Sequence, residues 1–226
     1  MLLLGIDCSA TYCSLRGVVL AMNRAVIFDA FGTLLKMQAG RHPYRRLIKL
    51  GITQGRRPQA DDIRRIMCNP WGLRDTAQAF GIEAPETTML ELEESLKAEV
   101  EGIEAYPDAL EAVELLMSRG VAIGVCSNLG MPYGEAVRRH FPALNAYTFS
   151  YAVGAMKPEQ AIYEACCADL AHMPSAILMI GDSFQCDCEG PKAAGIPGYY
   201  LDRTCGLGDF PDLMTFAMQV LSDDRL

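Results

Sequence analysis

The sequence AVIFDAFGT at residues 25–33 joins a run of four apolar residues to an aspartate and then to a Gly-Thr pair. A strand that is buried on both faces is apolar throughout, whereas a half-buried strand alternates apolar and polar residues. The run therefore predicts a central strand of a parallel sheet. Asp29 stands at the carboxyl end of that strand, and Gly32 permits a sharp turn shortly after it.

Apolar runs of the same kind recur along the chain, and each is followed by a helical pattern. Alternation of strands and helices is typical of an α/β fold in which helices cover both faces of a parallel sheet. The sequence thus predicts a Rossmann-like core. Further strands are expected at 121–126, 176–180 and 199–201, and helices at 108–119, 134–140, 159–170 and 187–194.

Residues 36–105 interrupt this alternation, because the whole block lacks a convincing strand. Its periodic segments predict about four helices, near 43–50, 59–67, 71–80 and 86–100. The block follows the first strand directly, so we interpret it as an all-helical cap inserted into the core. The predicted division is an N-terminal extension at 1–21, a Rossmann-like core at 22–35 and 106–226, and a helical cap at 36–105.

Composition excludes several classes of protein. The 226 residues are 50% hydrophobic and carry a net charge of −8, so the chain can bury a core and lacks the basic surface of a general nucleic-acid-binding protein. No apolar run approaches the roughly 18 residues of a membrane span. Nine cysteines are scattered through apolar runs without a C-x-x-C pair, which favours a reduced, cytoplasmic protein over a disulfide framework.

The charge of the predicted cap is unevenly distributed. Residues 36–74 contain ten basic and two acidic side chains, whereas residues 75–105 contain one lysine and nine acidic side chains. Two halves of a helical bundle can neutralise each other through exposed pairs, and this is the interpretation that we favour. The alternative is a positive face of the cap that is turned toward an anionic substrate.

Residues 1–21 precede a second methionine, Met22, and contain a competing aspartate. The segment lacks the basic start and the unbroken apolar run of a signal peptide. Either a hairpin or an extension from an upstream start site fits it. Asp7 also follows an apolar run, but neither a Gly-Thr turn nor a helical insertion comes after it, so we expect no catalytic role for Asp7.

Polar residues stand at the ends of several predicted strands or loops. In open α/β sheets the ligand lies outside the carboxyl ends of the strands, so these side chains are expected to converge on one crevice. An aspartate can attack a substrate covalently, a hydroxyl and an ammonium group can hold anionic oxygens, and two carboxylates can share Mg²⁺. The residues are Asp29, Ser127, Asn128, Lys157, Asp182 and Asp187.

These motifs resemble those of the haloacid dehalogenase-like hydrolase superfamily over residues 24 to about 203. FDAFGTLL is similar to the first motif of that superfamily, CSN to the second, MKP to the third and GDSFQCD to the fourth. The superfamily also inserts its cap just after the first motif, where this chain places its helical block. The resemblance implies a Rossmann-like core and catalysis through an aspartyl-enzyme intermediate.

The resemblance implies roles for the residues of the first three motifs. Asp29 would be the nucleophile, and Ser127 and Lys157 would complete the catalytic set by holding the transferred group. Thr33 and Asn128 would contact the substrate. The expected partner is a small anionic substrate, with no nucleic acid and no membrane, and a homodimer is an arrangement that the sequence leaves open.

The resemblance also implies a metal site. In most members of the superfamily Mg²⁺ is bound by the nucleophile, a backbone carbonyl two residues on, and an acid of the fourth motif. In this chain these would be Asp29, the backbone carbonyl of Phe31, and Asp182. Asp187 would support the site from behind these ligands.

Phe31 departs from the pattern of the family phosphatases, which usually carry there a second aspartate that protonates the leaving group. The haloacid dehalogenases of the superfamily resemble the chain at this position, but they need no metal and usually lack an acid at the position of Asp182. We favour Mg²⁺-dependent hydrolysis of a small phosphorylated substrate. A 2-haloacid dehalogenase and a catalytically weak binding protein are the alternatives. His42 and Arg45 of the cap are candidate proton donors in place of the missing acid.

Overall fold

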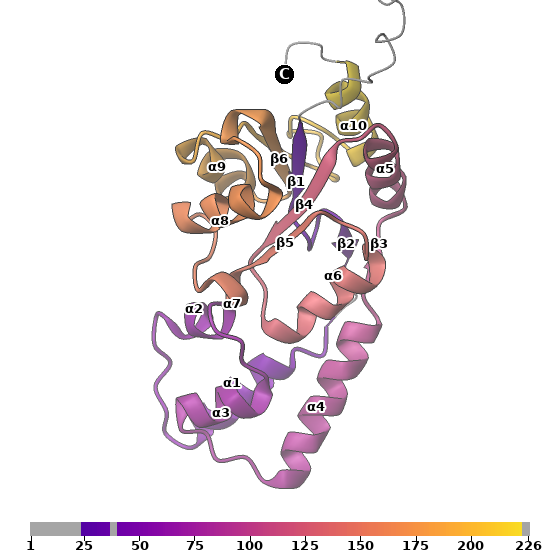
Figure 1. The fold of residues 1–226 in the computed structure, drawn as a ribbon. Helices are drawn as coiled ribbons and strands as arrows, with labels where there is room; N and C mark the ends of the chain where they lie inside the picture. The colour runs from indigo at the N-terminus through magenta and orange to yellow at the C-terminus, as the bar shows by residue number, and fades with distance from the viewer. Residues whose placement is uncertain (1–23, 37–39, 223–226) are drawn as a thin grey trace, which may run out of the picture.

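The computed structural model describes residues 24–36 and 40–222, and Figure 1 shows that they form a sheet with its helices and a separate group of helices from the insertion. The predicted extension at 1–21, with Asp7, lies outside the described residues. No helix of the described segments is both long and apolar enough to cross a membrane.

Five parallel strands form the main sheet, in the order β5-β4-β1-β6-β7. β1 lies in the centre because all four of its residues are apolar and buried. The sequence does not predict β5, which is an edge strand with a half-buried tyrosine and a threonine in its four residues. The strands are β1 (Ala25–Phe28), β4 (Ala122–Ser127), β5 (Ala146–Phe149), β6 (Ile177–Gly181) and β7 (Gly198–Tyr200).

The register of the sheet fixes which residues meet at its carboxyl edge. Phe28 at the end of β1 pairs with Val125 on one side and with Ile180 on the other. The amide of Asp29 then donates a hydrogen bond to the carbonyl oxygen of Ile180, at 3.0 Å. The residues that follow all three central strands therefore leave the sheet at one edge, as the α/β prediction requires.

Helices cover both faces of the sheet (Figure 1). Alternate residues of β1 point to opposite faces: Phe28 packs in the cluster that contains residues of α5 and α10, and Ile27 packs in the cluster that contains residues of α8. The covering helices are α5 (Pro107–Ser118), α6 (Gly134–His140), α7 (Ser150–Val153), α8 (Gln160–Leu170), α9 (Gly190–Ala193) and α10 (Leu213–Ser222). Shorter turns are η1 (Met131–Tyr133), η2 (Pro174–Ala176) and the π-helical η3 (Phe184–Glu189).

The helical insertion lies between two short strands, β2 and β3, which pair antiparallel and join it to the core. Two-residue strands are too short to show any periodicity, which is why the sequence predicts no strand in this block. The insertion is otherwise helical, as expected. Its elements are β2 (Leu35–Lys36), α1 (Pro43–Thr53), α2 (Asp62–Met67), α3 (Leu73–Phe80), α4 (Glu86–Glu101) and β3 (Glu104–Ala105).

Ion pairs use several of the basic residues of the insertion. Arg74 pairs with Glu86 and Glu93 of α4, so the basic and acidic halves do neutralise each other at this point. Arg56 pairs with Asp62 inside the basic half. Arg64 reaches across to Glu159 of the core at 3.0 Å. The part of the charge that pairs in this way is not available to a substrate.

Candidate active site

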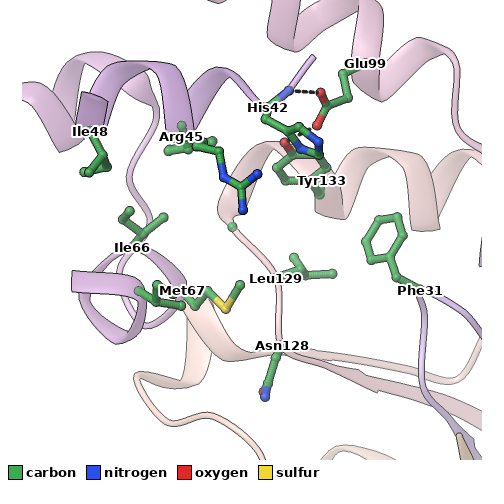
Figure 2. A pocket seen from close by; sticks show the side chains of 13 residues that line it. Phe31, His42, Arg45, Ile48, Ile66, Met67, Glu99, Asn128, Leu129 and Tyr133 are labelled. Atoms are coloured by element: carbon green, nitrogen blue, oxygen red, sulfur yellow. Dashed lines mark hydrogen bonds between the residues drawn. The ribbon is translucent and has the colours of Figure 1, made fainter. Parts of the chain in front are cut away.

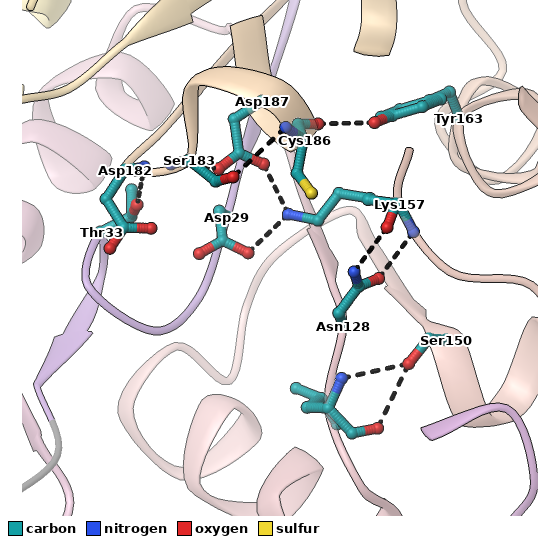
Figure 3. Close-up of polar contacts among 11 residues, drawn as sticks. Asp29, Thr33, Asn128, Ser150, Lys157, Tyr163, Asp182, Ser183, Cys186 and Asp187 are labelled. Atoms are coloured by element: carbon teal, nitrogen blue, oxygen red, sulfur yellow. Dashed lines mark hydrogen bonds and ion pairs between the residues drawn. The ribbon is translucent and has the colours of Figure 1, made fainter. Parts of the chain in front are cut away.

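Asp29 lies directly after β1 and is 7% exposed. Its Oδ1 accepts a hydrogen bond from the Lys157 ammonium at 2.6 Å (Figure 3). The same ammonium donates to Oδ1 of Asp187, also at 2.6 Å. The carboxylates of the first and fourth motifs are thus joined through the lysine of the third.

Lys157 is held by its backbone as well as by its side chain. The side-chain amide of Asn128 donates to the carbonyl oxygen of Lys157 at 2.8 Å and accepts from its amide nitrogen at 2.7 Å. Burial lowers the pKa of the Lys157 ammonium, but the nearby charges of Asp29 and Asp187 outweigh that effect and hold the pKa above its usual value. The lysine is therefore a fixed cation at neutral pH.

Asp187 is fully buried and uses both carboxylate oxygens inside the protein. Oδ1 accepts from Lys157, and Oδ2 accepts from the backbone amide of Ser183 at 3.0 Å. Burial raises the pKa of Asp187 to about 6, against the opposing effect of Lys157. Gly181 makes room for this side chain, because a Cβ at that position would lie 2.3 Å from the carboxyl carbon of Asp187.

Asp182 lies at the open side of the site and is exposed. Its backbone amide donates to the Thr33 hydroxyl at 3.1 Å. Gly32 has φ of 84°, and a Cβ there would lie 1.9 Å from Oδ2 of Asp182, so the first-motif turn accepts this carboxylate only with glycine. Loss of hydration, followed by the negative charge of Asp29, raises the pKa of Asp182 to about 6.

Three carboxylates therefore share one small volume. Asp29, Asp182 and Asp187 each offer an oxygen, and these oxygens lie within 4.8 Å of one another. Lys157 supplies one positive charge, which leaves the ionised group with a net charge of minus two. Both oxygens of Asp187 have partners, so Asp29 and Asp182 are the carboxylates with capacity left for a cation. This donor set fits a hard divalent ion such as Mg²⁺.

The other predicted residues lie beside this cluster. Ser127 is the last residue of β4 and is buried, and no hydrogen bond from another described residue occupies its hydroxyl. Thr33 is fully buried with its hydroxyl on the amide of Asp182. Asn128 is turned toward the backbone of Lys157 (Figure 3). The structure thus brings the predicted residues together. Thr33 and Asn128 form hydrogen bonds to the backbone of other site residues, Asp182 and Lys157.

Arg203 is a contributor that sequence reasoning missed. Its guanidinium donates to the carbonyl oxygen of Thr33 at 2.8 Å and to Asp108 at 2.8 Å, and it lies over the ring of Tyr106. Arg203 therefore fixes the turn that carries Thr33, and through it the amide of Asp182. No signal in the sequence marks it, because it stands in an irregular segment after β7.

A pocket of about 520 Å³ lies between the insertion and the core (Figure 2). Phe31 and Leu129 line it from the loops that also carry Asp29 and Ser127. Helices α1 and α2 close it from the insertion with Arg45, Ile48 and further apolar side chains. The pocket thus adjoins the loops of the carboxylate cluster.

A small polar network stands at one side of the pocket. The Tyr133 hydroxyl donates to Oε1 of Glu99 at 2.7 Å, and the backbone amide of His42 donates to Oε2 at 2.8 Å. Burial and the Glu99 carboxylate raise the pKa of Tyr133 far above its usual value, so the phenol stays protonated. Sequence reasoning named His42 but missed Glu99 and Tyr133, whose pairing joins α4 to the turn before α6.

The chain is similar to known proteins in its family motifs and in its fold. A family model described as haloacid dehalogenase-like hydrolase matches residues 23–195. No curated protein matches the chain. A HAD phosphatase from Thermococcus onnurineus has 21% identity and a TM-score of 0.61, with 90% of this chain and 100% of that chain covered. The L-2-haloacid dehalogenase from Xanthobacter autotrophicus with covalently bound chloropropionic acid has 17% identity and a TM-score of 0.60, with 88% and 98% covered.

A third solved structure contains a metal. A HAD family enzyme from Bacteroides thetaiotaomicron, in complex with magnesium and inorganic phosphate, has 18% identity and a TM-score of 0.57, with 81% of this chain and 96% of that chain covered. Identities this low establish a common fold and no common substrate. The family model, in contrast, spans most of the chain and all four motifs. The chain therefore belongs to the haloacid dehalogenase-like hydrolases.

Proposed function

We propose that the chain is a Mg²⁺-dependent phosphatase that acts on a small phosphorylated substrate, with Asp29 as nucleophile. The observation that carries this proposal is the meeting of Asp29 with Asp182 in a cluster of three carboxylates in which, among the described residues, Lys157 is the cation that forms ion pairs. Like charges at this distance favour a cation between them, and a phosphate dianion needs positive charge to enter.

The proposed reaction has two steps. One oxygen of Asp29 attacks the phosphorus, the bond to the leaving-group oxygen breaks, and that oxygen departs with the electron pair. Water then attacks the phosphorus of the aspartyl phosphate, loses its proton to solvent, and releases inorganic phosphate with the Asp29 carboxylate restored. The other carboxylate oxygen of Asp29 stays hydrogen-bonded to the Lys157 ammonium, and this contact keeps the nucleophile oriented during both steps.

The metal would be held by Asp29 and Asp182, and we retain the backbone carbonyl of Phe31 as its third protein ligand. When bound, Mg²⁺ supplies positive charge to the phosphoryl oxygens. Asp187 would not bind it directly, because Lys157 and the amide of Ser183 occupy both of its oxygens. Its role is to balance Lys157 and to fix the turn of the fourth motif.

The residues around the cluster divide into two roles. The Ser127 hydroxyl and the Lys157 ammonium would hold the transferred phosphoryl group by hydrogen bond and by charge. Thr33 and Asn128 act as positioning residues, since their polar groups hold the amide of Asp182 and the backbone of Lys157. The substrate contacts expected for them from the resemblance remain a prediction.

A 2-haloacid dehalogenase is the second candidate, and Phe31 is the observation that favours it. A displaced halide needs no proton, so a site without an acid at position 31 suits that reaction. The attack by Asp29 would be the same, with carbon in place of phosphorus. The net negative cluster around Asp182 weighs against this candidate, because a carboxylate substrate would enter it without a metal to neutralise the charge.

A panel of phosphomonoesters and 2-haloacids, assayed with Mg²⁺ and with EDTA, separates the two candidates. We expect release of phosphate from aryl phosphates with Mg²⁺ and its loss in EDTA. Halide release that is unaffected by EDTA, without phosphatase activity, would establish the dehalogenase instead. Binding without turnover of either class would leave the third alternative, a catalytically weak binding protein.

A further inference from the structure

We infer that the pocket beside Phe31 binds a mostly apolar leaving group that carries an anionic substituent, and that Arg45 pairs with this substituent. The inference rests on the proposed function and specifies its substrate class: an aryl or similarly bulky phosphate with a carboxylate-type group, as opposed to a sugar phosphate. It is carried by the lining of the pocket and by the partners of each polar group in it.

The lining is mainly apolar. Phe31 and Leu129 stand on the core side, and Ile48, Ile66 and Met67 stand on the insertion side (Figure 2). Phe31 is fixed by edge-to-face contact with Tyr133, at 6.1 Å between ring centroids. A volume of about 520 Å³ between such walls suits a ring or a branched hydrocarbon. A sugar would lose its water in this pocket without regaining as many hydrogen bonds.

Most polar groups of the pocket already have partners. The side-chain nitrogen and oxygen of Asn128 both form hydrogen bonds with the backbone of Lys157. The Glu99 carboxylate accepts from Tyr133 with one oxygen and from His42 with the other. These groups define one side of the pocket without offering the free donors and acceptors that several hydroxyl groups would need.

Arg45 is different. Its guanidinium points into the middle of the pocket in Figure 2, and within residues 24–36 and 40–222 no carboxylate forms an ion pair with it. The arginines of the insertion at positions 56, 64 and 74 each pair with a carboxylate. Those at 41, 46, 57 and 65 form no ion pair with a described residue either, but they do not line the pocket, whereas Arg45 does. A guanidinium without a carboxylate beside apolar walls is suited to a carboxylate that arrives with the ligand.

The absence of an acid at position 31 agrees with this substrate class. A phenolate or similar group leaves without a proton, whereas a sugar alkoxide requires one, at a cost of about 10²–10⁴-fold when the acid is missing. The walls of the pocket and the chemistry of the first motif therefore favour the same kind of leaving group by independent routes.

The first arm of the test separates apolarity from leaving-group acidity. Cyclohexylmethyl phosphate and glucose 6-phosphate are both primary alkyl phosphates on a six-membered ring, and they differ in the hydroxyl groups and the ring oxygen of the sugar. We expect cyclohexylmethyl phosphate to inhibit the hydrolysis of phenyl phosphate at a concentration at least tenfold lower than glucose 6-phosphate. Equal or stronger inhibition by the sugar would overturn the apolar part of the inference and leave the proposed function standing.

The second arm tests Arg45. In the wild type we expect kcat/KM for 4-carboxyphenyl phosphate to exceed that for the neutral 4-carbamoylphenyl phosphate by about tenfold, because one partly screened charge pair is gained. Arg45→Met should abolish this ratio. Arg46→Met is the matched control, since Arg46 is exposed like Arg45 but does not line the pocket, and it should keep the ratio.

The outcomes of the second arm are distinct. A ratio of one in the wild type, or a ratio that survives Arg45→Met, would overturn the role of Arg45. Failure to release phosphate from any of these compounds with Mg²⁺ would instead overturn the proposed function, and the inference with it. Circular dichroism of both variants shows whether a lost ratio reflects a lost fold.

Discussion

Asp29 is the proposed nucleophile and pairs with Lys157, so its charge is the first quantity to change. Asp29→Asn keeps the size of the side chain and removes the attacking charge, and we expect turnover to fall below detection while the fold is retained. Asp7→Asn should leave the rate unchanged, because Asp7 lacks the turn and insertion that follow Asp29. Initial rates and circular dichroism of both variants check this. A comparable loss in Asp7→Asn would reverse the choice of nucleophile.

Loss of the Asp182 carboxylate should weaken the binding of the metal. Asp182→Ser removes one of the two oxygen donors with capacity left for a cation. We expect the Mg²⁺ concentration for half-maximal activity to rise sharply, with the maximal rate partly recovered at high Mg²⁺. Asp61→Ser, an exposed acid of the insertion, is the control and should titrate like the wild type. Wild-type Mg²⁺ dependence of Asp182→Ser would remove Asp182 from the metal site.

In the proposed reaction, Phe31 stands where a general acid for the leaving group is missing. Phe31→Asp places a carboxylic acid two residues after the nucleophile, and we expect it to raise the hydrolysis of alkyl phosphates relative to aryl phosphates, within the 10²–10⁴-fold range of general acid catalysis. Phe31→Asn introduces a side chain of the same size as aspartate but without an acidic group. It should therefore leave the ratio of alkyl to aryl phosphate hydrolysis unchanged. In the wild type, equal rates for aryl and alkyl phosphates would mean that another residue, such as His42 or Arg45, already supplies the proton.

Asn128 joins the segment after β4 to the segment before α8, whereas the Arg64–Glu159 ion pair joins the insertion to the core, and we expect the contacts of Asn128 to contribute more to stability. Asn128→Ala removes two hydrogen bonds to Lys157, and we expect the free energy of unfolding to fall by about 1–3 kcal/mol. Glu159→Gln breaks the exposed pair with Arg64 and should change stability by less than about 1 kcal/mol. Urea denaturation of both variants measures this contrast. A larger effect of Glu159→Gln would mean that the contact between insertion and core dominates.

The elements could be predicted where burial leaves a clear pattern. β1, β4 and β6 are apolar runs in the middle of the sheet, and the sequence places each within a residue or two of its bounds. The edge strand β5 contains Tyr147, half-buried, and gives no such run. The segment after Asp182 forms the π-helical η3 before α9, with Asp187 turned inward to Lys157, whereas helical periodicity alone predicts one helix at 187–194.

The sequence predicts those residues of the candidate site that follow strands. It does not predict the residues that other loops and helices contribute. Asp29, Ser127 and Asp182 are at strand ends, so a parallel sheet brings them together by topology alone. Arg203 comes from a loop and Glu99 from the last turn of α4, and polar residues at such positions are ordinary surface residues in most proteins. Only the folded chain brings Arg203 to the carbonyl of Thr33 and Glu99 to Tyr133.

The molecule as a whole divides its tasks between two parts. The sheet core positions the charged cluster, and the sequence motifs predict the residues of this cluster. The insertion closes a mostly apolar pocket with Arg45 pointing into it, and no sequence motif predicts this pocket. The alternative interpretation of the basic half of the insertion, a positive face toward an anionic substrate, is retained in our proposal for this single arginine.

The central claim is a phosphoryl group carried on Asp29, and acid quenching tests it directly. The protein is mixed with ³²P-labelled phenyl phosphate and Mg²⁺, quenched in acid within milliseconds to seconds, digested, and the labelled peptide is sequenced by mass spectrometry. We predict label on the peptide that contains Asp29, absent in EDTA and absent in Asp29→Asn. Phosphate release at the full rate with no label on that peptide, or label on another residue, would contradict the account.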